Sequence, residues 1–369
     1  MKFFCEKAVL AEAVSICSRA VSAKSTISVL EGLFISAGEQ VSVCGYDLKT
    51  GMRCSFEANI EQEGEVVLNA RVFGDIIRKL PDDIVEISVD DKMITTIKCS
   101  LSEFNIIGSS AEEFPVIPEV SKEMSIKIPQ KLLKSMINET VFAVSDNENK
   151  PVHTGTLFEI EDGYLSLVSV DGYRLALRKE KIEGLSEKVS FVVPGDTLKE
   201  AEKLMSESDD PVELFPDQKH ILFQIDNVII TARLLEGEFL NYRNAIPKDY
   251  GISYKMDTKA FIEAIERVSL IINDRLKNPV RCLFASGACR LSCVTSIGKS
   301  YDECTYEGKG DDIEIGFNHR YLLDALKACP DEEIAVELKS GLTPCVMRPA
   351  DKSEKFVFLV LPVRLRANE

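Results

Sequence analysis

The sequence predicts an α+β fold in which one unit, two helices packed on an antiparallel sheet, is repeated three times. A short alternating strand followed by an amphipathic helix occurs in three places, at residues 2–21, 125–144 and 253–272. A second helix follows in each copy, at residues 69–80, 194–205 and 317–327, and alternating strands then close the copy. We therefore expect three domains, at residues 1–123, 124–251 and 252–369.

The first helix of each copy carries apolar residues four positions apart, as one buried helix face requires. These pairs are Leu10 and Val14, Leu133 and Ile137, and Phe261 and Ile265. After the helix, a Leu-Phe pair begins a strand in every copy, at residues 33–34, 157–158 and 283–284. A turn rich in Gly, Asp and Glu leads into a hairpin partner each time. We interpret the Leu-Phe pairs as equivalent positions of the repeat.

The second helix of each copy is preceded by a short polar residue, Asn69, Asp196 or Asn318. Such a side chain satisfies a free amide at a helix start, so we expect these three residues to be N-caps. Turns at residues 81–83, 209–211 and 330–332 end the helices. In the first copy the closing strands are expected at residues 83–89, 93–99 and 103–107.

Composition excludes several classes of protein. The 369 residues are 45% hydrophobic and 28% charged, which is ordinary globular usage and excludes a disordered or fibrous chain. The longest strongly apolar run, 356–361, is far too short to span a membrane. Residues 1–23 could pass for a secretory signal, but Glu6, Lys7 and Glu12 fit one face of an amphipathic helix better. We therefore expect a soluble, cytoplasmic protein.

The eleven cysteines indicate reduced, buried thiols, because the number is odd and no CxxC pair occurs. Cys289 and Cys293, with Cys282 and Cys304 nearby, form one cluster. Alternation along strands explains this cluster at least as well as a metal site does. We expect neither a metal nor a cofactor.

The charge is unevenly distributed. The chain has 44 basic and 60 acidic residues, a net charge of −16, which argues at first against a nucleic-acid partner. The six predicted helices together carry a small positive net charge, however. The rest of the chain is therefore even more negative than the total of −16. This polarity suits a helical surface that tolerates phosphates within an acidic exterior.

No catalytic constellation is apparent. The three histidines, His153, His220 and His319, lie in different neighbourhoods and none has HExxH spacing. Gly298-Lys299-Ser300 ends like a phosphate-binding loop, but Cys293 stands where its first glycine is needed. We interpret the chain as non-enzymatic; an enzyme with an unrecognised carboxylate site remains an alternative.

Four strings of residues occur in order along the three copies. They are Val170 to Ala176, Glu236 to Phe239 with Tyr242 and Arg243, Ile315 to Asn318 with Tyr321 to Leu323, and Leu361 to Leu365. Together with the repeat, they resemble bacterial sliding clamps, the beta subunits of DNA polymerase III, over essentially the whole chain. The resemblance implies a DNA clamp fold: a ring of six such domains from two chains, with sheets outside and helices lining the hole.

The resemblance also implies a function without covalent chemistry. Such a ring encircles duplex DNA, slides along it and holds the replicative polymerase on its template. The implied partners are double-stranded DNA, a second copy of the chain, a clamp loader, the catalytic subunit of the replicative polymerase, and repair and translesion polymerases that carry clamp-binding peptides. A scaffold of the same fold that never encircles DNA is the alternative.

The resemblance assigns residues to three surfaces. DNA contact is carried over to Lys24, Arg71, Arg78, Lys79, Asn147 and Lys150. A peptide pocket between the second and third domains is carried over to His153, Thr154, Val170, Gly172, Tyr173, Arg174, Leu175, Leu240, Asn244, Ala245, Tyr321, Cys345, Val346, Leu361, Pro362, Val363 and Arg364. For the dimer, we expect strand 102–107 to be a sheet edge whose Phe104 and Ile106 pack against Leu270 and Ile271 of a second chain.

Three features depart from the family pattern. Leu240 replaces a common proline and Asn244 a common arginine, so we expect a less basic pocket rim. Residues 366–369 extend the chain past Leu365 and are expected along the path of the peptide. The segment from Lys24 to Leu30 lacks the arginine and prolines that relatives often carry there, which predicts a less rigid loop.

Overall fold

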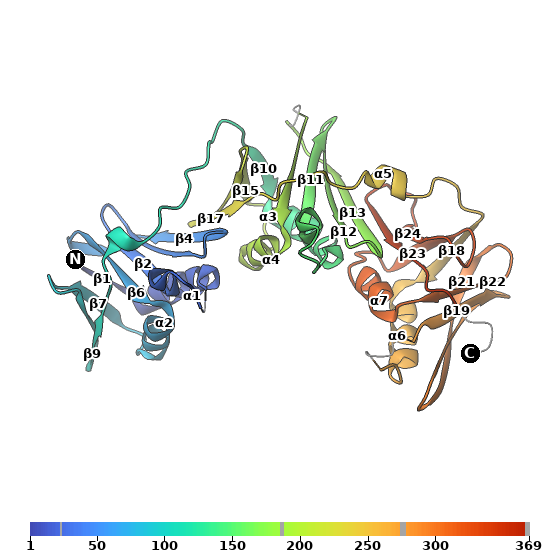
Figure 1. The fold of residues 1–369 in the computed structure, drawn as a ribbon, viewed down its shortest axis with the longest axis horizontal. Helices are drawn as coiled ribbons and strands as arrows, with labels where there is room; N and C mark the ends of the chain where they lie inside the picture. The colour runs from blue at the N-terminus through green and yellow to red at the C-terminus, as the bar shows by residue number, and fades with distance from the viewer. Residues whose placement is uncertain (23, 185–187, 274–277, 366–369) are drawn as a thin grey trace. The chain divides into compact units, whose positions relative to one another are not determined.

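The computed structural model describes residues 1–22, 24–184, 188–273 and 278–365 (Figure 1). The chain divides into two compact units. The first comprises residues 1–131 and 203–234, and the second comprises residues 132–202 and 235–369. The middle repeat therefore contributes strands to both units. No helix among the described residues is long and apolar enough to cross a membrane.

Two antiparallel sheets build the first unit. One has five strands in the order β5 (Asn59–Gln62), β1 (Lys2–Glu6), β7 (Ile84–Val89), β8 (Ile94–Cys99) and β9 (Ser102–Ile107). The other has eight, in the order β10 (Ile126–Pro129), β15 (Pro211–Pro216), β16 (His220–Ile225), β17 (Val228–Arg233), β4 (Thr50–Phe56), β3 (Val41–Tyr46), β2 (Gly32–Ala37) and β6 (Gly64–Asn69). The pair β17–β4 joins strands of the second repeat to those of the first.

The helices α1 (Lys7–Cys17) and α2 (Ala70–Lys79) lie side by side on one face of these strands (Figure 1). Leu10, Val14, Phe73 and Ile77 are buried, as the apolar spacing of α1 and the amphipathic pattern of α2 require. A Cβ atom at Gly45 of β3 would lie 2.0 Å from the carbonyl oxygen of Cys17, so only glycine allows α1 to approach this closely.

One twelve-stranded antiparallel sheet builds the second unit. Its order is β14 (Val189–Pro194), β11 (Gly155–Glu161), β12 (Tyr164–Val170), β13 (Arg174–Lys181), β25 (Phe356–Val360), β24 (Cys345–Pro349), β23 (Glu333–Leu338), β18 (Ile252–Asp257), β21 (Gly298–Lys309), β20 (Ala288–Thr295), β19 (Val280–Ala285) and β22 (Ile313–Phe317). The pair β13–β25 joins the second repeat to the third, just as β4–β17 joins the first to the second.

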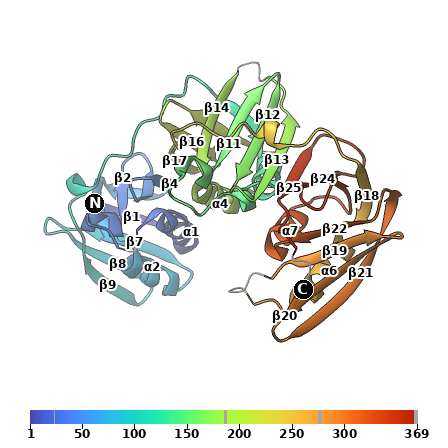
Figure 2. The ribbon, with the colours of Figure 1, turned by 45° about the vertical axis from the view of Figure 1, so that its right-hand side comes forward.

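The other helices are α3 (Gln130–Asn138), α4 (Gly195–Leu204), α5 (Tyr242–Ala245), α6 (Thr258–Ser269) and α7 (His319–Lys327). Helices α6 and α7 pack on each other, α6 covers β18 to β21, and α7 contacts β25 (Figure 2). A buried ion pair at 2.8 Å, between Arg178 of β13 and Glu139 just after α3, lies beside the β13–β25 seam. The same guanidinium donates to the carbonyl of Lys355 at 3.2 Å, so it ties the two repeats together.

Two of the three predicted N-caps are confirmed. The side chain of Asn69 accepts from the amide of Val72, and that of Asn318 accepts from the amide of Arg320, each at 3.0 Å. The prediction for Asp196 is wrong, because α4 begins at Gly195 and Asp196 lies inside its first turn. An acidic side chain there still interacts favourably with the positive end of the helix dipole.

The register predicted from the Leu-Phe pairs is also wrong. Asn69 pairs with Gly32 and Pro194 pairs with Gly155, so Leu33 corresponds to Thr156, and Leu157 corresponds to Phe34. In the third repeat, Phe317, the residue before the Asn318 cap, pairs with Val280. Val280 therefore corresponds to Leu33, and Leu283 lies three positions after it. A shift of one residue moves a side chain to the other face of a sheet, and a bulky apolar pair does not specify which face is which.

Candidate functional site

A tight turn between β12 and β13 forms the centre of the predicted peptide pocket. One carboxylate oxygen of Asp171 accepts from the amides of Tyr173 at 2.8 Å and Arg174 at 3.0 Å. Gly172 has φ = +91°, a left-handed conformation that other residues adopt only with strain. The amide of Asp171 donates to the carbonyl of Arg174 at 3.3 Å, which closes the hairpin turn.

Arg174 fixes this turn against α7. Its Nε donates to Asp171 at 2.9 Å, one terminal nitrogen donates to Asp324 of α7, and its guanidinium carbon lies 4.6 Å from the centre of the Tyr321 ring. The rings of Tyr173 and Tyr321 stack with centres 5.8 Å apart, and Tyr173 is exposed. Because two carboxylates already occupy Arg174, its main role is to position the turn and the tyrosine pair.

An apolar row crosses the sheet below the turn. Neighbouring strands place Val170 opposite Leu175, Leu175 opposite Leu359, and Leu359 opposite Val346. Leu175, Leu359 and Val346 are buried in one cluster and Val170 is also buried, whereas Leu361 beside them is 36% exposed. Leu359 is absent from the predicted pocket, although it lies on β25 only two residues before Leu361.

Cys345 does not belong to this row. It pairs with Val360, and both residues are buried in the core on the helix side of the sheet. Burial raises the pKa of its thiol far above the ordinary value. The prediction that Cys345 lines the pocket is therefore wrong for its side chain, because alternation along β24 turns it away from Val346.

The remaining predicted pocket residues form a rim around the row. The ring of His153 meets Phe239 edge-on with centres 5.7 Å apart, and burial together with nearby Lys150 lowers the pKa of His153. The hydroxyl of Thr154 donates to the carbonyl of Pro151 at 2.7 Å. Leu240, Asn244 and Ala245 are exposed, on α5 or just before it.

The C-terminal segment leaves the sheet at Leu361. Its amide donates to the carbonyl of Tyr173 at 2.8 Å, and Val363 then makes an isolated bridge to Gly316. Residues 361–365 therefore form no continuous strand. Pro362 is half-buried and Arg364 is exposed. The predicted extension at residues 366–369 lies outside the described residues.

The junction of the first and second repeats copies this arrangement. Asp47 accepts from the amides of Lys49 and Thr50, and the amide of Arg233 donates to the carbonyl of Lys49. These contacts match those of Asp171, Tyr173 and Leu361. By the same pairing, Gly51 takes the place of Leu175, and Thr231 takes the place of Leu359.

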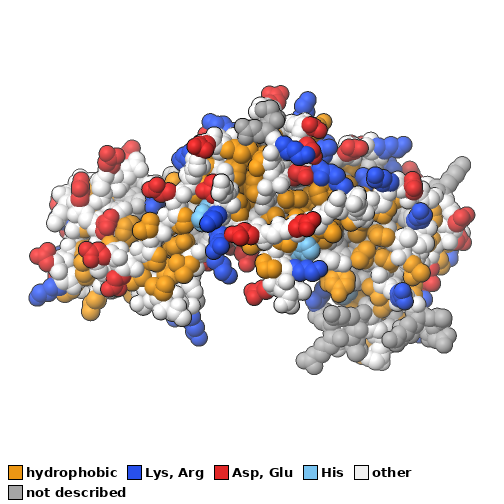
Figure 3. Space-filling model, turned by 45° about the horizontal axis from the view of Figure 1, so that its top comes forward, with side chains coloured by type: hydrophobic (Ala, Val, Ile, Leu, Met, Phe, Trp, Pro, Cys, Tyr) orange, Lys and Arg blue, Asp and Glu red, His pale blue; other side chains and the backbone are white. Residues whose placement is uncertain are grey.

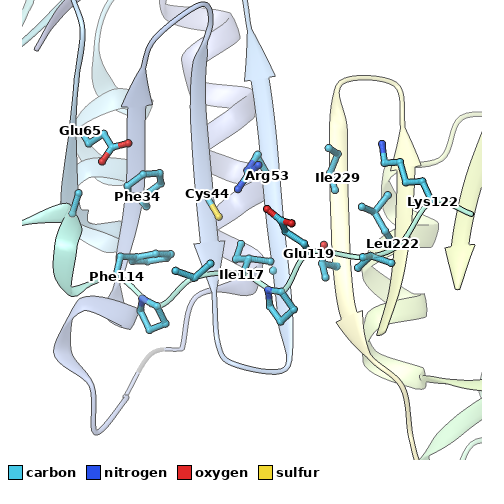
Figure 4. A pocket seen from close by; sticks show the side chains of 17 residues that line it. Phe34, Cys44, Arg53, Glu65, Phe114, Ile117, Glu119, Lys122, Leu222 and Ile229 are labelled. Carbon is cyan, nitrogen blue, oxygen red and sulfur yellow. The ribbon is translucent and has the colours of Figure 1, made fainter. Parts of the chain in front are cut away.

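The chain's own linker covers the first junction (Figure 4). Phe114 stacks on Phe34 with ring centres 5.4 Å apart, and a Cβ atom at Gly51 would lie 2.9 Å from Cδ1 of Ile117. A pocket of about 570 Å³ remains between the linker and the sheet. A linker side chain thus fills space that Leu175 fills at the second junction, where Leu361, Leu240 and Tyr173 stay exposed.

The predicted DNA-contact residues are all on the surface. Arg71, Arg78 and Lys79 are exposed along α2, and Arg71 and Arg78 line a groove of about 690 Å³ between α1 and α2. Arg78 also pairs with Asp75 at 3.3 Å. Lys24 is exposed in the loop after α1. In the second unit, Lys150 is exposed, and the side chain of Asn147 accepts from the amide of Asn149 at 3.0 Å.

The predicted dimer residues have the expected exposure. Strand β9 ends its sheet, so the edge prediction is confirmed. Phe104 is 39% exposed and Ile106 is half-buried, while Ile107, which sequence reasoning did not single out, is 83% exposed. Leu270 at the end of α6 is also 83% exposed, and Ile271 is half-buried. Large apolar side chains that are exposed together in this way are typical of a surface that binds another protein.

Comparisons with known proteins agree over the whole chain. Models of the N-terminal, central and C-terminal domains of the DNA polymerase III beta subunit match residues 1–118, 127–241 and 243–364. The beta sliding clamps of Halalkalibacterium halodurans and Bacillus subtilis are each 35% identical, over 99% of this chain and their whole length. The chain belongs to the family of DNA polymerase III beta subunits, the sliding clamps.

Solved structures give the same result. The crystal structure of the sliding clamp from Bacillus subtilis superimposes with a TM-score of 0.96 at 34% identity, covering 99% of this chain and all of that one. A DNA polymerase III beta subunit from Eubacterium rectale gives a TM-score of 0.94 at 33% identity, covering 98% and 99%. The predicted three-domain clamp fold is thereby confirmed, and the function is that of a non-catalytic processivity factor.

The turn of this sliding clamp can be tested at Gly172. A Cβ atom there would meet no neighbour, so replacement by alanine is disfavoured by the positive φ alone. We expect Gly172→Ala to lower the free energy of unfolding by about 1–2 kcal/mol in urea melts. Gly38 also has open space but no positive φ, so Gly38→Ala should stay within about 0.5 kcal/mol. Equal effects of the two changes would contradict the role of the turn.

Proposed function

We propose that two copies of this sliding clamp close head to tail into a ring around duplex DNA, and that each copy offers one peptide cleft to its partners. The partners are DNA polymerase III, a clamp loader, and repair and translesion polymerases that carry short clamp-binding peptides. The full-length match to sliding clamps in all three repeats carries this proposal. Domain limits at residues 1–123, 124–251 and 252–369 and a cytoplasmic location belong to the same proposal.

Exposed edges support the assembly. The free side of β9 presents unpaired amides and carbonyls together with Phe104 and Ile107. In the third repeat, β21 has β20 on one side over residues 298–305, and β18 reaches it only from residue 306 onward. An edge of this kind accepts another antiparallel strand. We assign β9 of one copy to this part of β21 in the other, with Leu270 and Ile271 packed against Phe104 and Ile106.

The charge distribution supports sequence-independent contact with DNA. Acidic and basic side chains are scattered among one another on the face shown in Figure 3. Arg71, Arg78 and Lys79 follow one another along α2, where each can approach a phosphate. Few phosphates are neutralised by such a sparse set, so topology rather than affinity must keep the ring on DNA.

The apolar side chains at the second junction support one peptide site per chain. A short peptide has little surface, so its affinity must come from apolar anchors that enter a preformed pocket. The buried row below Leu361 provides the apolar base, and exposed Tyr173, Leu240 and Leu361 provide side chains that a peptide can cover. At the first junction, Phe114 and Ile117 of the linker cover the equivalent row.

The encircling model predicts a difference between DNA forms. We expect clamps loaded on nicked circular DNA by a clamp loader to survive a high-salt wash, because a closed ring cannot slide off a circle. Clamps on the same DNA after linearisation should be lost, since their direct affinity is weak and falls steeply with salt. Gel filtration of the two samples measures this. Equal loss from both would favour a scaffold that never encircles DNA.

The cleft predicts a specific effect of Leu361→Asp. A charge at this half-exposed position should weaken binding of a Gln-Leu-x-Leu-Phe-type peptide, expected near micromolar, by at least about tenfold, because it must be desolvated on binding. Fluorescence anisotropy measures the affinity. The matched control is Val116→Asp, an exposed apolar residue of the first linker, which should leave binding unchanged. Unchanged affinity in a folded, dimeric Leu361→Asp protein would show that the cleft is misplaced; Val363→Asp provides a second, independent variant.

A further inference from the structure

The hairpin that leads into β21 has the same turn as the two junctions within the chain. In each turn, an amide donates to the side chain of the residue two positions before it. The three pairs are Lys49 with Asp47, Tyr173 with Asp171 and Ile297 with Thr295. The strands that follow these turns, β4, β13 and β21, are therefore equivalent, and β21 offers to a second copy the edge that β4 and β13 give to β17 and β25.

Each of these strands has one residue at the same place beside the first helix of its repeat. The strand residue lies four positions after the residue that closes the turn, and the helix residue lies nine positions after the first residue of the helix. The matched residues are Cys54 with Ile16, Arg178 with Glu139, and Asp302 with Arg267. Cys54 and Ile16 are both buried, whereas the other two matches are ion pairs.

The ion pair at β21 has reversed charges and is more exposed. At the second junction, the strand supplies Arg178 and the helix side supplies Glu139, and their side chains are 8% and 4% exposed. At β21, which packs on α6 (Figure 2), the helix supplies Arg267 and the strand supplies Asp302, with exposed fractions of 55% and 21%. We expect a strand that docks on β21 to bury this pair, as β25 adjoins Arg178.

The repeat also gives the register in which β9 docks, because one residue after the last strand of each repeat pairs with the third residue before the second helix. These pairs are Ser109 with Val67, Leu235 with Val192 and Val363 with Gly316. Eight residues earlier, a carbonyl of the incoming strand accepts from an amide of the receiving strand. These bonds join Ser55 to Asn227 at 3.2 Å and Lys179 to Lys355 at 2.8 Å. By the same count, Leu101 takes the place of Lys355, and Glu303 takes the place of Lys179.

The apolar contact already assigned to the two copies has a counterpart within the chain. Phe142, after α3, and Phe358 of β25 take the places of Leu270 and Phe104 in this alignment. The rings of Phe142 and Phe358 meet edge-on with centres 5.6 Å apart. The alignment therefore brings Leu270 onto Phe104 without using the exposure of either residue.

Ser102 of β9 lies opposite Asp302 in this register, where Phe356 lies opposite Arg178. The hydrogen bond at Glu303 is one position further along, so Ser102 and Asp302 form a non-hydrogen-bonded pair, in which Cα atoms are only about 4.5 Å apart. In the single chain, Oδ1 of Asp302 accepts from the amide of Glu303 at 2.8 Å, and Oδ2 accepts from Nε of Arg267. Transfer of the Glu303 amide to an incoming strand leaves Oδ1 in need of another donor.

We propose that the hydroxyl of Ser102 in one copy donates to Asp302 in the other copy, and that Arg267 holds this carboxylate in position. Docking passes the amide of Glu303 to the carbonyl of Leu101, and Ser102 replaces that amide as the donor to Oδ1 of Asp302. A carboxylate acceptor makes this a charge-assisted hydrogen bond. The contact rests on the head-to-tail ring proposed above and adds to it a register and a polar pair.

The contact predicts that a second carboxylate at residue 102 opens the ring. Ser102→Asp places two carboxylates side by side at both junctions, so the dissociation constant of the dimer should rise at least about a hundredfold, about tenfold for each junction. Asp302→Ser should also weaken the dimer, because it leaves Arg267 covered without its carboxylate. Sedimentation velocity over a dilution series measures both constants, and thermal melts show whether the single chains are folded.

Mixing the two variants separates a contact between copies from a change within one chain. A dimer of one Ser102→Asp chain and one Asp302→Ser chain has one wild-type junction and one junction in which serine and aspartate have exchanged places. We expect this mixed dimer to form at concentrations where each variant alone is monomeric, as measured by native mass spectrometry. A chain that fails to fold cannot restore its partner, so such a recovery shows coupling across the interface.

Asn105→Asp is the matched control. It adds the same charge to β9 on the opposite face of the strand, so it should leave the dimer intact. If Asp302→Ser melts early, the chain with both changes decides: a dissociation constant within about tenfold of the wild type supports the contact, and one as high as that of Ser102→Asp overturns it.

The wild type separates this contact from the ring itself. A monomeric wild-type protein would contradict the ring. A dimeric wild type together with a Ser102→Asp protein of unchanged dissociation constant, or with a mixture that stays monomeric, would overturn the contact and its register alone.

Discussion

Unpaired strand edges are the constraint on which the rest of this structure depends. A strand at the end of a sheet leaves amides and carbonyls without partners, and the chain meets this need mainly by joining one repeat to the next. The pairs β4–β17 and β13–β25 make equivalent hydrogen bonds. At each junction the same kind of turn precedes the first strand, and an amide just after the second strand donates to a carbonyl of that turn. The linkers that follow the first and second repeats then cross the sheet face beside these turns.

The two junctions differ in what covers that face. At the first, Gly51 and Thr231 leave a shallow row, and Phe114 and Ile117 pack into it from the linker. At the second, the larger side chains of Leu175 and Leu359 fill this space. The linker packs Phe239 and Tyr242 against one side of the row, and Leu240 and Leu361 stay exposed. One backbone arrangement therefore gives a closed junction and an open one. The closed and open junctions differ in side-chain size at two positions, Gly51 or Leu175 and Thr231 or Leu359.

Periodicity predicted the elements well, because helices and strands follow the spacing of apolar residues. The two asparagine caps and the free edge at β9 were also predictable, since each follows from local chemistry. The alignment of the three repeats on one another was not predictable. Leu33 and Leu157 are both buried apolar residues, and only the backbone pairing shows that they are not equivalent. The positions of Cys345 and Leu359 were not predictable for the same reason. Deciding which side of the sheet each faces requires the register of β24 with β25.

The role of Arg174 required the structure for a different reason. Its sequence neighbours predict a turn, but its ion pair with Asp324 spans 150 residues of sequence, and no local pattern indicates such a contact. The same holds for Arg178 and Glu139, whose pair ties α3 to the second seam. Long-range contacts between charged groups are set by the tertiary fold, so the sequence alone identifies the residues but not their partners.

Assembly through the β9 edge is the central claim of this account, and molar mass in solution tests it most directly. Light scattering at micromolar concentration should give twice the chain mass for the wild type and the chain mass for the double variant Leu270→Lys, Ile271→Lys. Leu342→Lys, which changes another exposed leucine of the third repeat, should remain dimeric. A folded double variant that stays dimeric would contradict the assigned interface.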